Sequence, residues 1–252
     1  WLKFGLFTVG LGQSFVFVLV PPLARDLGLS EIQTSSIFAI SALAWATTSA
    51  FWGRTSDKYG RRNIAILGLV GYSISLIALI TPLFLAQKNL LNVSLLFPAL
   101  VLGRLINGLV GSATRPASFA YIADITSKDN RTVKFARLES SFLLGTVAGP
   151  LVGGFLFLIS NETPFYVFSG LAFIAAIGIY RKLDSVTKKK NTVKKLNKIN
   201  WYSSTIWPFL AFAAVLSLCQ ASLLQSIGFY ITDLYSDFDN LPTLISMTFA
   251  LL

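Results

Sequence analysis

The sequence predicts an all-α integral membrane protein, built as a bundle of transmembrane helices. Only 13% of the 252 residues are charged, which is about half the share found in soluble domains. Long apolar runs recur along the chain, and the longer ones reach the length of about 20 residues that a helix needs to cross a bilayer. The cations lie in short segments between these runs, which is typical of the loops of membrane proteins.

Seven apolar runs are long enough to span a membrane, and an eighth begins near residue 241. The expected spans are residues 4–22, 32–52, 64–85, 95–123, 138–159, 164–180 and 205–231. We expect a six-helix N-terminal half over 1–180, a basic linker over 181–204, and the start of a second bundle, helix 7 and a truncated helix 8, over 205–252. The chain starts at Trp1 and ends inside the eighth run, so we expect it to be part of a longer protein.

Loop charges give the orientation. The turns after the first and third spans carry one cation each, Arg25 and Lys88. Cations are abundant after the second, fourth and sixth spans: Arg54, Lys58, Arg61, Arg62, Lys128, Arg131, Lys134, Arg137 and the lysines of 181–204. Because positively charged loops stay inside, we expect a multi-pass protein of the cell (inner) membrane, with its N-terminus and the 181–204 linker in the cytoplasm. The net charge of +10 is split among these segments, so it indicates a lipid bilayer as the partner and not nucleic acid.

Composition also limits the chemistry. The chain has no histidine and a single cysteine, Cys219, so a metal site of cysteine and histidine is excluded. We expect no metal and no cofactor. A membrane enzyme would need a nucleophile, metal ligands or paired acids at one depth, and the sequence shows none of these. The protein is therefore not expected to be an enzyme.

The turn after the second span is short and densely charged. It runs from Gly53 to Arg62 with the sequence GRTSDKYGRR. Gly53 and Gly60 allow close backbone approach and unusual dihedrals. Asp57 can pair with Arg61, with Arg62 or with the positive end of a helix. Such a cluster can act as a gate that holds while two helix ends meet, and the plainer interpretation is a tight hairpin that obeys the positive-inside rule.

An arginine lies deep in the fourth span. Arg104, Asn107, Gly108 and Gly111 are spaced i, i+3, i+4 and i+7, so they share one helix face. A guanidinium at membrane depth is costly and should face a watery cavity or a partner. Arg104 and Asn107 therefore mark a candidate site for substrate or proton coupling. Arg115 lies nearer the inner end of the span, where it can extend to the interface.

The fifth span has a face of small residues. Gly145, Gly149 and Gly153 recur at four-residue spacing, which allows another helix to pack closely. Pro150 removes a backbone donor and predicts a bend, and Gly154 extends the small-residue run. The residues alone favour a hinge and a close-packing face equally.

Three of these patterns resemble motifs of the major facilitator superfamily of transporters. Segment 53–62 is similar to that family's loop between helices 2 and 3, Arg104 with Gly108 to its helix 4 arginine motif, and segment 145–154 to the helix 5 motif of its drug:proton antiporters. The resemblance covers essentially all of the first six spans. It implies two halves that rock around a central site, with Asp57 and its arginines in a cytoplasmic gate. It also implies that Arg104 couples protons to substrate and that the helix of Gly149 forms the antiporter-type interface.

One departure concerns the proton carrier. The first three spans hold no buried carboxylate, and Asp124 and Glu139 lie near the inner ends of their helices. Either the titrating acid lies outside this chain or the driving ion is not a proton. The remaining polar side chains that could line a cavity are Gln13, Ser14, Asn107, Gln220 and Gln225. Interhelical hydrogen bonds between buried amides explain each of these, taken singly, at least as well.

The sequence thus predicts a secondary transporter that exports small organic or drug-like compounds against proton uptake, and that works as a monomer. Two other transport activities stay open: export of a specific metabolite or siderophore, and symport of sugars or organic acids. A non-transporting membrane receptor is a further alternative, against which the intact charges of segment 53–62 argue.

Overall fold

The computed structural model describes residues 1–184 and 207–234. Within those ranges the chain is helical and has no strand. Most of the expected linker and the expected eighth span, in 185–206 and 235–252, lie outside the described residues. The helices are α1 (Leu2–Asp26), α2 (Glu31–Tyr59), α3 (Arg61–Gln87), α4 (Val93–Leu109), α5 (Thr114–Ile125), α6 (Arg131–Phe157), α7 (Thr163–Lys182) and α8 (Trp207–Leu234), with 3₁₀ turns η1 (Gly111–Ala113) and η2 (Lys128–Asn130).

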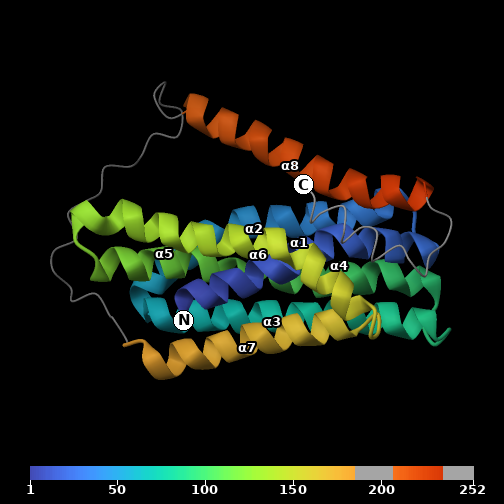
Figure 1. Cartoon of the computed structure of the whole chain (residues 1–252), viewed down its shortest axis with the longest axis horizontal. Helices are drawn as coiled ribbons and strands as arrows, with labels where there is room; N and C mark the ends of the chain where they lie inside the picture. The colour runs from blue at the N-terminus through green and yellow to red at the C-terminus, as the bar shows by residue number, and fades with distance from the viewer. Residues whose placement is uncertain (185–206, 235–252) are drawn as a thin grey trace.

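The helices run side by side along the long axis of the molecule (Figure 1). Five stretches of the described chain are long and apolar enough to cross a membrane: Leu2–Asp26, Arg61–Gln87, Val93–Ile125, Lys128–Phe157 and Thr163–Lys182. α2 is not among them, because serine, threonine and charged residues interrupt its apolar sequence. The described chain is therefore an all-α, multi-pass membrane bundle, as the sequence predicts.

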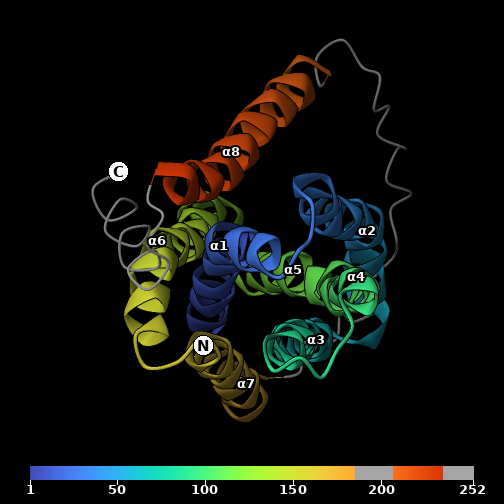
Figure 2. The ribbon, with the colours of Figure 1, turned by 90° about the vertical axis from the view of Figure 1, so that its right-hand side faces the viewer.

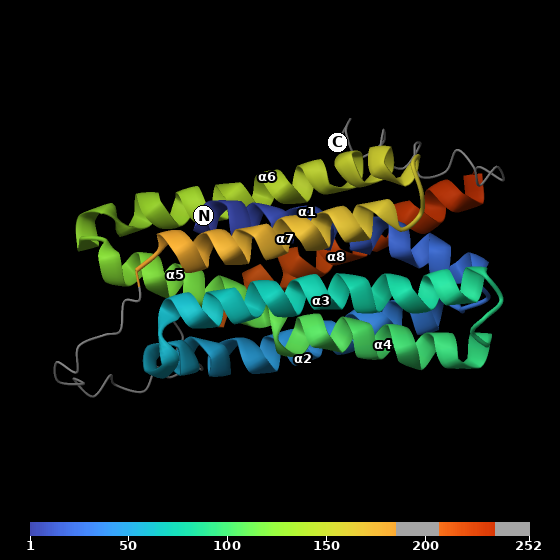
Figure 3. The ribbon, with the colours of Figure 1, turned by 90° about the horizontal axis from the view of Figure 1, so that it is seen from below.

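α1 lies at the centre of the bundle (Figure 2). It packs against α6, α7 and α8, and most of its side chains are buried. Phe15 shows how it is held, since its ring meets the rings of Phe165 and Phe168 edge to face at 5.0 and 5.4 Å. On the other side of the bundle, α3 contacts α4 and α7, and α2 packs along α4 (Figure 3).

The glycine face of the fifth expected span is a packing surface. Gly145, Gly149 and Gly153 are buried on α6 against α1. A Cβ on Gly145 would collide with the backbone oxygen of Phe7, and one on Gly149 with the Oγ of Ser14. Only glycine lets two helix backbones approach this closely. Of the two interpretations of the pattern, the structure matches close packing between α1 and α6.

The charged turn of the sequence is mostly helical. α2 continues to Tyr59 and α3 begins at Arg61, so Gly60 alone joins them. Gly60 has φ +94°, a conformation that glycine adopts without strain. Gly53 instead lies inside α2, and an added Cβ there would make only ordinary contact with Pro116, at 3.9 Å. The expectation of an unusual dihedral is therefore right for Gly60 and wrong for Gly53.

The fourth expected span is broken where the sequence predicts one helix. α4 ends at Leu109, and the chain passes through η1 before α5 begins. In the 3₁₀ turn the Ala113 N–H donates to the Val110 oxygen, which leaves the Leu109 oxygen free to accept a bond of 2.6 Å from Trp52 Nε1 of α2. A side chain on a neighbouring helix thus takes over a carbonyl that the α-helix would otherwise use.

Candidate functional site

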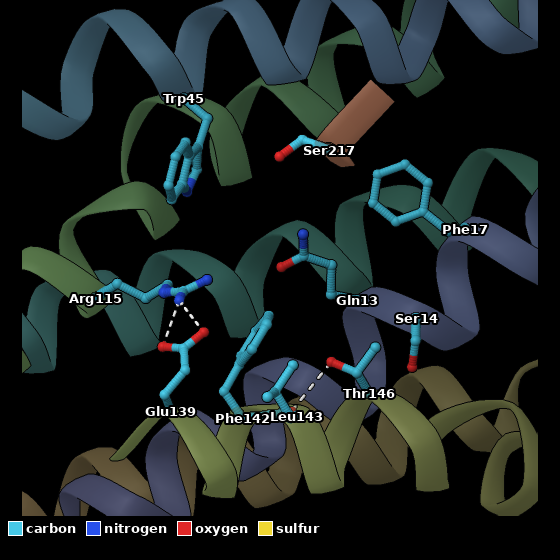
Figure 4. Close-up of a pocket in the computed structure, with 10 residues that line it drawn as sticks. All are labelled: Gln13, Ser14, Phe17, Trp45, Arg115, Glu139, Phe142, Leu143, Thr146 and Ser217. Carbon is cyan, nitrogen blue, oxygen red and sulfur yellow. Dashed lines mark hydrogen bonds and ion pairs between the residues drawn. The ribbon is translucent and has the colours of Figure 1, made fainter. Parts of the chain in front are cut away.

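A cavity of about 450 Å³ lies between α1, α2, α5, α6 and α8 (Figure 4). Its wall combines aromatic rings, polar side chains and one pair of opposite charges. The lining residues are Gln13, Ser14, Phe17, Trp45, Arg115, Glu139, Phe142, Leu143, Thr146 and Ser217. The volume suits a small organic molecule.

The opposite charges are Arg115 of α5 and Glu139 of α6. Arg115 Nη2 donates to both carboxylate oxygens of Glu139 at 2.6 Å, and the two side chains face each other on the cavity wall (Figure 4). They are 30% and 37% exposed. The Arg115 guanidinium also lies over the ring of Phe142, 4.4 Å from its centre. Arg115 therefore pairs within the cavity, where the sequence suggested that it extends to the interface.

The position of Glu139 corrects an expectation. The sequence placed it near the inner end of its helix, because the fifth span was expected to begin at residue 138. α6 begins at Arg131 instead, so Glu139 lies about 12 Å along the helix from its start. Its carboxylate lines the same cavity as Gln13.

Sequence reasoning missed most of the aromatic wall and all of its α6 stripe except Glu139. Phe142, Leu143 and Thr146 follow Glu139 at i+3, i+4 and i+7, which puts all four on one helix face. That spacing was available as a signal. Phe17, Trp45 and Ser217 come from three other helices, and no pattern along the sequence connects them.

Gln13 and Ser14 line the cavity as expected, and Figure 4 shows the Gln13 amide pointing into it. Ser14 Oγ donates to the Gly10 oxygen at 3.0 Å, so part of its hydrogen-bonding capacity is used within α1. The side chains of Gln220 and Gln225, on α8, lie outside the described residues.

Arg104 lies behind the cavity wall. Its side chain is buried, and its guanidinium lies beside the stacked rings of Phe17 and Phe38, 5.5 and 5.4 Å from their centres. Its Nε and Nη1 have no hydrogen-bond partner among the described residues. Phe17 lines the cavity on one side and contacts Arg104, so one ring connects the two sites.

The rest of the helix 4 face packs against α2. Ser41 Oγ donates to the Arg104 backbone oxygen at 2.9 Å, and Gly108 lies directly against the Ser41 backbone. Asn107 is buried on the same face. Neither Asn107 nor Gly108 lines the cavity described above.

A second charged cluster surrounds Arg61 at one end of the bundle. Arg61 Nε donates to Asp124 Oδ2 of α5 at 3.0 Å, and Nη2 pairs with Asp57 of α2. Its Nη1 donates to Ser56 Oγ at 2.6 Å and to the Gly53 oxygen at 3.2 Å. The side chain is only 8% exposed. One guanidinium thus joins α2, α3 and α5.

Arg62 points to a different helix. Its Nη1 donates to the Leu183 oxygen at 3.0 Å, and its guanidinium lies over the ring of Tyr180 at 5.4 Å. The sequence offered both arginines as partners for Asp57, and the structure pairs Asp57 with Arg61. It adds Asp124, which the sequence did not connect with segment 53–62.

Membrane-length helices around a cavity of this size, with an ion pair on its wall, define a polytopic membrane protein that has room for a small solute. The family model described as "Major Facilitator Superfamily" matches residues 2–252. The chain belongs to this family of transporters, as the sequence motifs suggest.

Two relatives show which members resemble it. The chain is 30% identical over 207 residues to "Quinolone resistance protein NorA" of Staphylococcus aureus, a match that covers 79% of this chain and 50% of that protein. It is 34% identical over 160 residues to "Tetracycline resistance protein, class B" of Escherichia coli, covering 62% of this chain and 37% of that protein. The chain therefore spans about half the length of the curated relatives it matches.

Proposed function

We propose that the protein is a secondary transporter that exports small amphipathic or drug-like organic compounds in exchange for protons, by alternating access. The observation that carries the proposal is the cavity of about 450 Å³, because its aromatic rings and its charges suit compounds with both apolar and polar parts. Membership of a transporter family and relatives named for quinolone and tetracycline resistance support it.

The proposal assigns parts to the chain. Residues 1–180 form the N-terminal bundle, 181–204 a cytoplasmic linker and 205–252 the start of the second bundle. The protein lies in the cell (inner) membrane with its N-terminus in the cytoplasm, as its loop charges indicate, and it works as a monomer. The cavity wall that α8 contributes is then part of the substrate path between the two bundles.

Three sites have separate roles in this proposal. The cluster of Asp57 and Arg61 holds helix ends together at the cytoplasmic gate. Arg104 senses whether the cavity is occupied through Phe17, whose ring lines the cavity and contacts Arg104. Arg104 then couples substrate binding to proton binding. The α1–α6 glycine face keeps the cavity wall rigid while the bundles move.

Inverted membrane vesicles test this function in the protein as its gene encodes it. The vesicles are energised to acidify their interior, and a pH-sensitive dye reports proton release when cationic dyes, antibiotics or chelators are added. Substrate-dependent release is expected. No response from any compound, with the protein shown to be inserted, would argue against proton antiport and favour a narrow metabolite carrier or a different driving ion.

Two variants test the assigned residues. Arg104→Ala and Asp57→Asn should each reduce substrate-dependent proton release about tenfold or more while insertion is retained, since each removes a functional charge. Asp129→Asn, an exposed aspartate in η2, is the matched control and should behave like the parent protein. Normal transport by both variants would refute the site assignment.

A further inference from the structure

Arg115 and Glu139 are the charged groups among the described residues that line the cavity. α1 contributes Gln13, Ser14 and Phe17, while α2 and α8 contribute Trp45 and Ser217; α7 and η2 contribute no lining residue. The pair is open to the cavity, yet each ionic group has the other as its counterion. A ligand that enters therefore meets one positive and one negative group on a wall whose net charge is zero.

The pair responds differently to each ligand charge. An anion that binds Arg115 leaves Glu139 without a counterion, and a cation that binds Glu139 leaves Arg115 without one. In this partly solvated site, breaking one partner away from the pair carries part of the cost of leaving a buried charge unpaired. A ligand that carries both charges satisfies both groups at once, because its carboxylate replaces Glu139 and its ammonium replaces Arg115.

We propose that the Arg115–Glu139 pair is a recognition site for zwitterionic aromatic compounds, whose carboxylate binds Arg115 and whose ammonium binds Glu139. The two protein groups touch, so the ligand's charges must also be close together. The rings of Trp45, Phe17 and Phe142 line the same cavity and accept the apolar body of the ligand. This inference deepens the proposed function and rests on it, because it takes this cavity as the substrate site.

Four compounds on one scaffold test the inference by calorimetry on the purified protein as its gene encodes it. They are naphthylalanine (zwitterion), naphthylethylamine (cation), naphthylpropionate (anion) and naphthylpropionamide (neutral). At neutral pH naphthylalanine should bind about tenfold more tightly than the amine or the propionate, because a partly solvated pair carries only part of the full penalty.

Variants separate the pair from general effects of mutation. Glu139→Gln should raise the affinity for naphthylpropionate about tenfold relative to naphthylalanine, because Arg115 then has no competing carboxylate. Arg115→Gln should raise the affinity for naphthylethylamine relative to naphthylalanine, because Glu139 then has no competing guanidinium. A gain of affinity for one compound at the expense of another cannot arise from a misfolded protein. Glu162→Gln, which removes a carboxylate outside the cavity lining, should keep the parent's ranking and is the control.

The outcomes distinguish this inference from the proposed function. If substrates drive proton release in vesicles while the four compounds bind alike, or if Glu139→Gln keeps the parent's ranking, the zwitterion site is overturned and the antiport proposal stands. If the ranking and its predicted change in Glu139→Gln are observed without any proton release, the recognition site stands and antiport is overturned. If none of the four compounds binds, the inference is overturned.

Discussion

Two guanidinium–carboxylate sites in this bundle use the same chemistry in opposite surroundings. Arg61, 8% exposed, has acceptors on α2 and α5, including Asp57 and Asp124. Arg115, 30% exposed, has one carboxylate partner, and that partner is 37% exposed to the cavity. The first guanidinium is shared among several helices, and the second can exchange its one partner for a ligand.

The difference teaches that the number of partners and the solvent exposure decide what an ion pair does. When a buried guanidinium loses one of its acceptors, one of its N–H donors is left unpaired. Such a group therefore fixes the helices that supply its acceptors. A half-exposed pair contributes little to stability because water competes for both groups. It is therefore available for binding.

The largest expected effect comes from the packing that supports the cavity pair and not from the pair itself. Gly149→Leu would force side-chain atoms against Ser14 and the Leu11 backbone of α1, where neither backbone can yield. We expect a loss of more than about 3 kcal/mol of stability, measured as loss of monodisperse protein in detergent. Gly170→Leu is the control, since a Cβ there meets no atom within 4 Å, and a variant of Gly149 as stable as this control would contradict the close packing.

Removing Arg61 should have the next largest effect. Arg61→Ala leaves Asp57 and Asp124 without their shared cation, which should cost about 3 kcal/mol in the free energy of unfolding, measured by titration with a denaturing detergent. Arg54→Ala removes an exposed arginine from the same end of α2 and should change stability by less than about 0.5 kcal/mol. Equal effects of the two substitutions would show that the cluster does not hold the helices together.

The two aspartates of the cluster should differ from each other. The Asp124 side chain is 15% exposed and the Asp57 side chain 50%. Asp124→Asn keeps an acceptor for Arg61 Nε but loses the charge, so it should cost about 1–2 kcal/mol. Asp57→Asn, in better solvated surroundings, should cost less than about 1 kcal/mol. The same unfolding titration compares the two variants. A larger loss of stability for Asp57→Asn than for Asp124→Asn would contradict the role given to burial.

The smallest effect on stability is expected in the cavity. Glu139→Gln should lower the free energy of unfolding by less than about 1 kcal/mol, because solvent screens a pair that is this exposed. The ligand preference should nevertheless change as described above. A loss of stability as large as that of Arg61→Ala would show that the pair is a structural fastener like the Arg61 cluster.

Much of the fold could be predicted because its signals are local. The length of the apolar runs anticipated the five membrane-length stretches of the described chain, although the expected span 32–52 is not among them. The four-residue spacing of Gly145, Gly149 and Gly153 offered a close-packing face as one of two interpretations. A glycine between Tyr59 and Arg61 marked a sharp turn. The predicted helix ends were less accurate. Charged residues such as those before Gly60 continue a helix beyond its apolar run, and hydropathy alone does not reveal this.

The sequence by itself determined the class of protein, the bundle of spans and the family. These depend on the length of the apolar runs and on the spacing of motifs along the chain. Only the tertiary structure decided that Arg61 meets Asp124 and that Arg115 meets Glu139 on a cavity wall. Such meetings depend on how each helix is rotated and shifted against its neighbours. That register is set by the packing of many side chains at once, and no local period in the sequence encodes it.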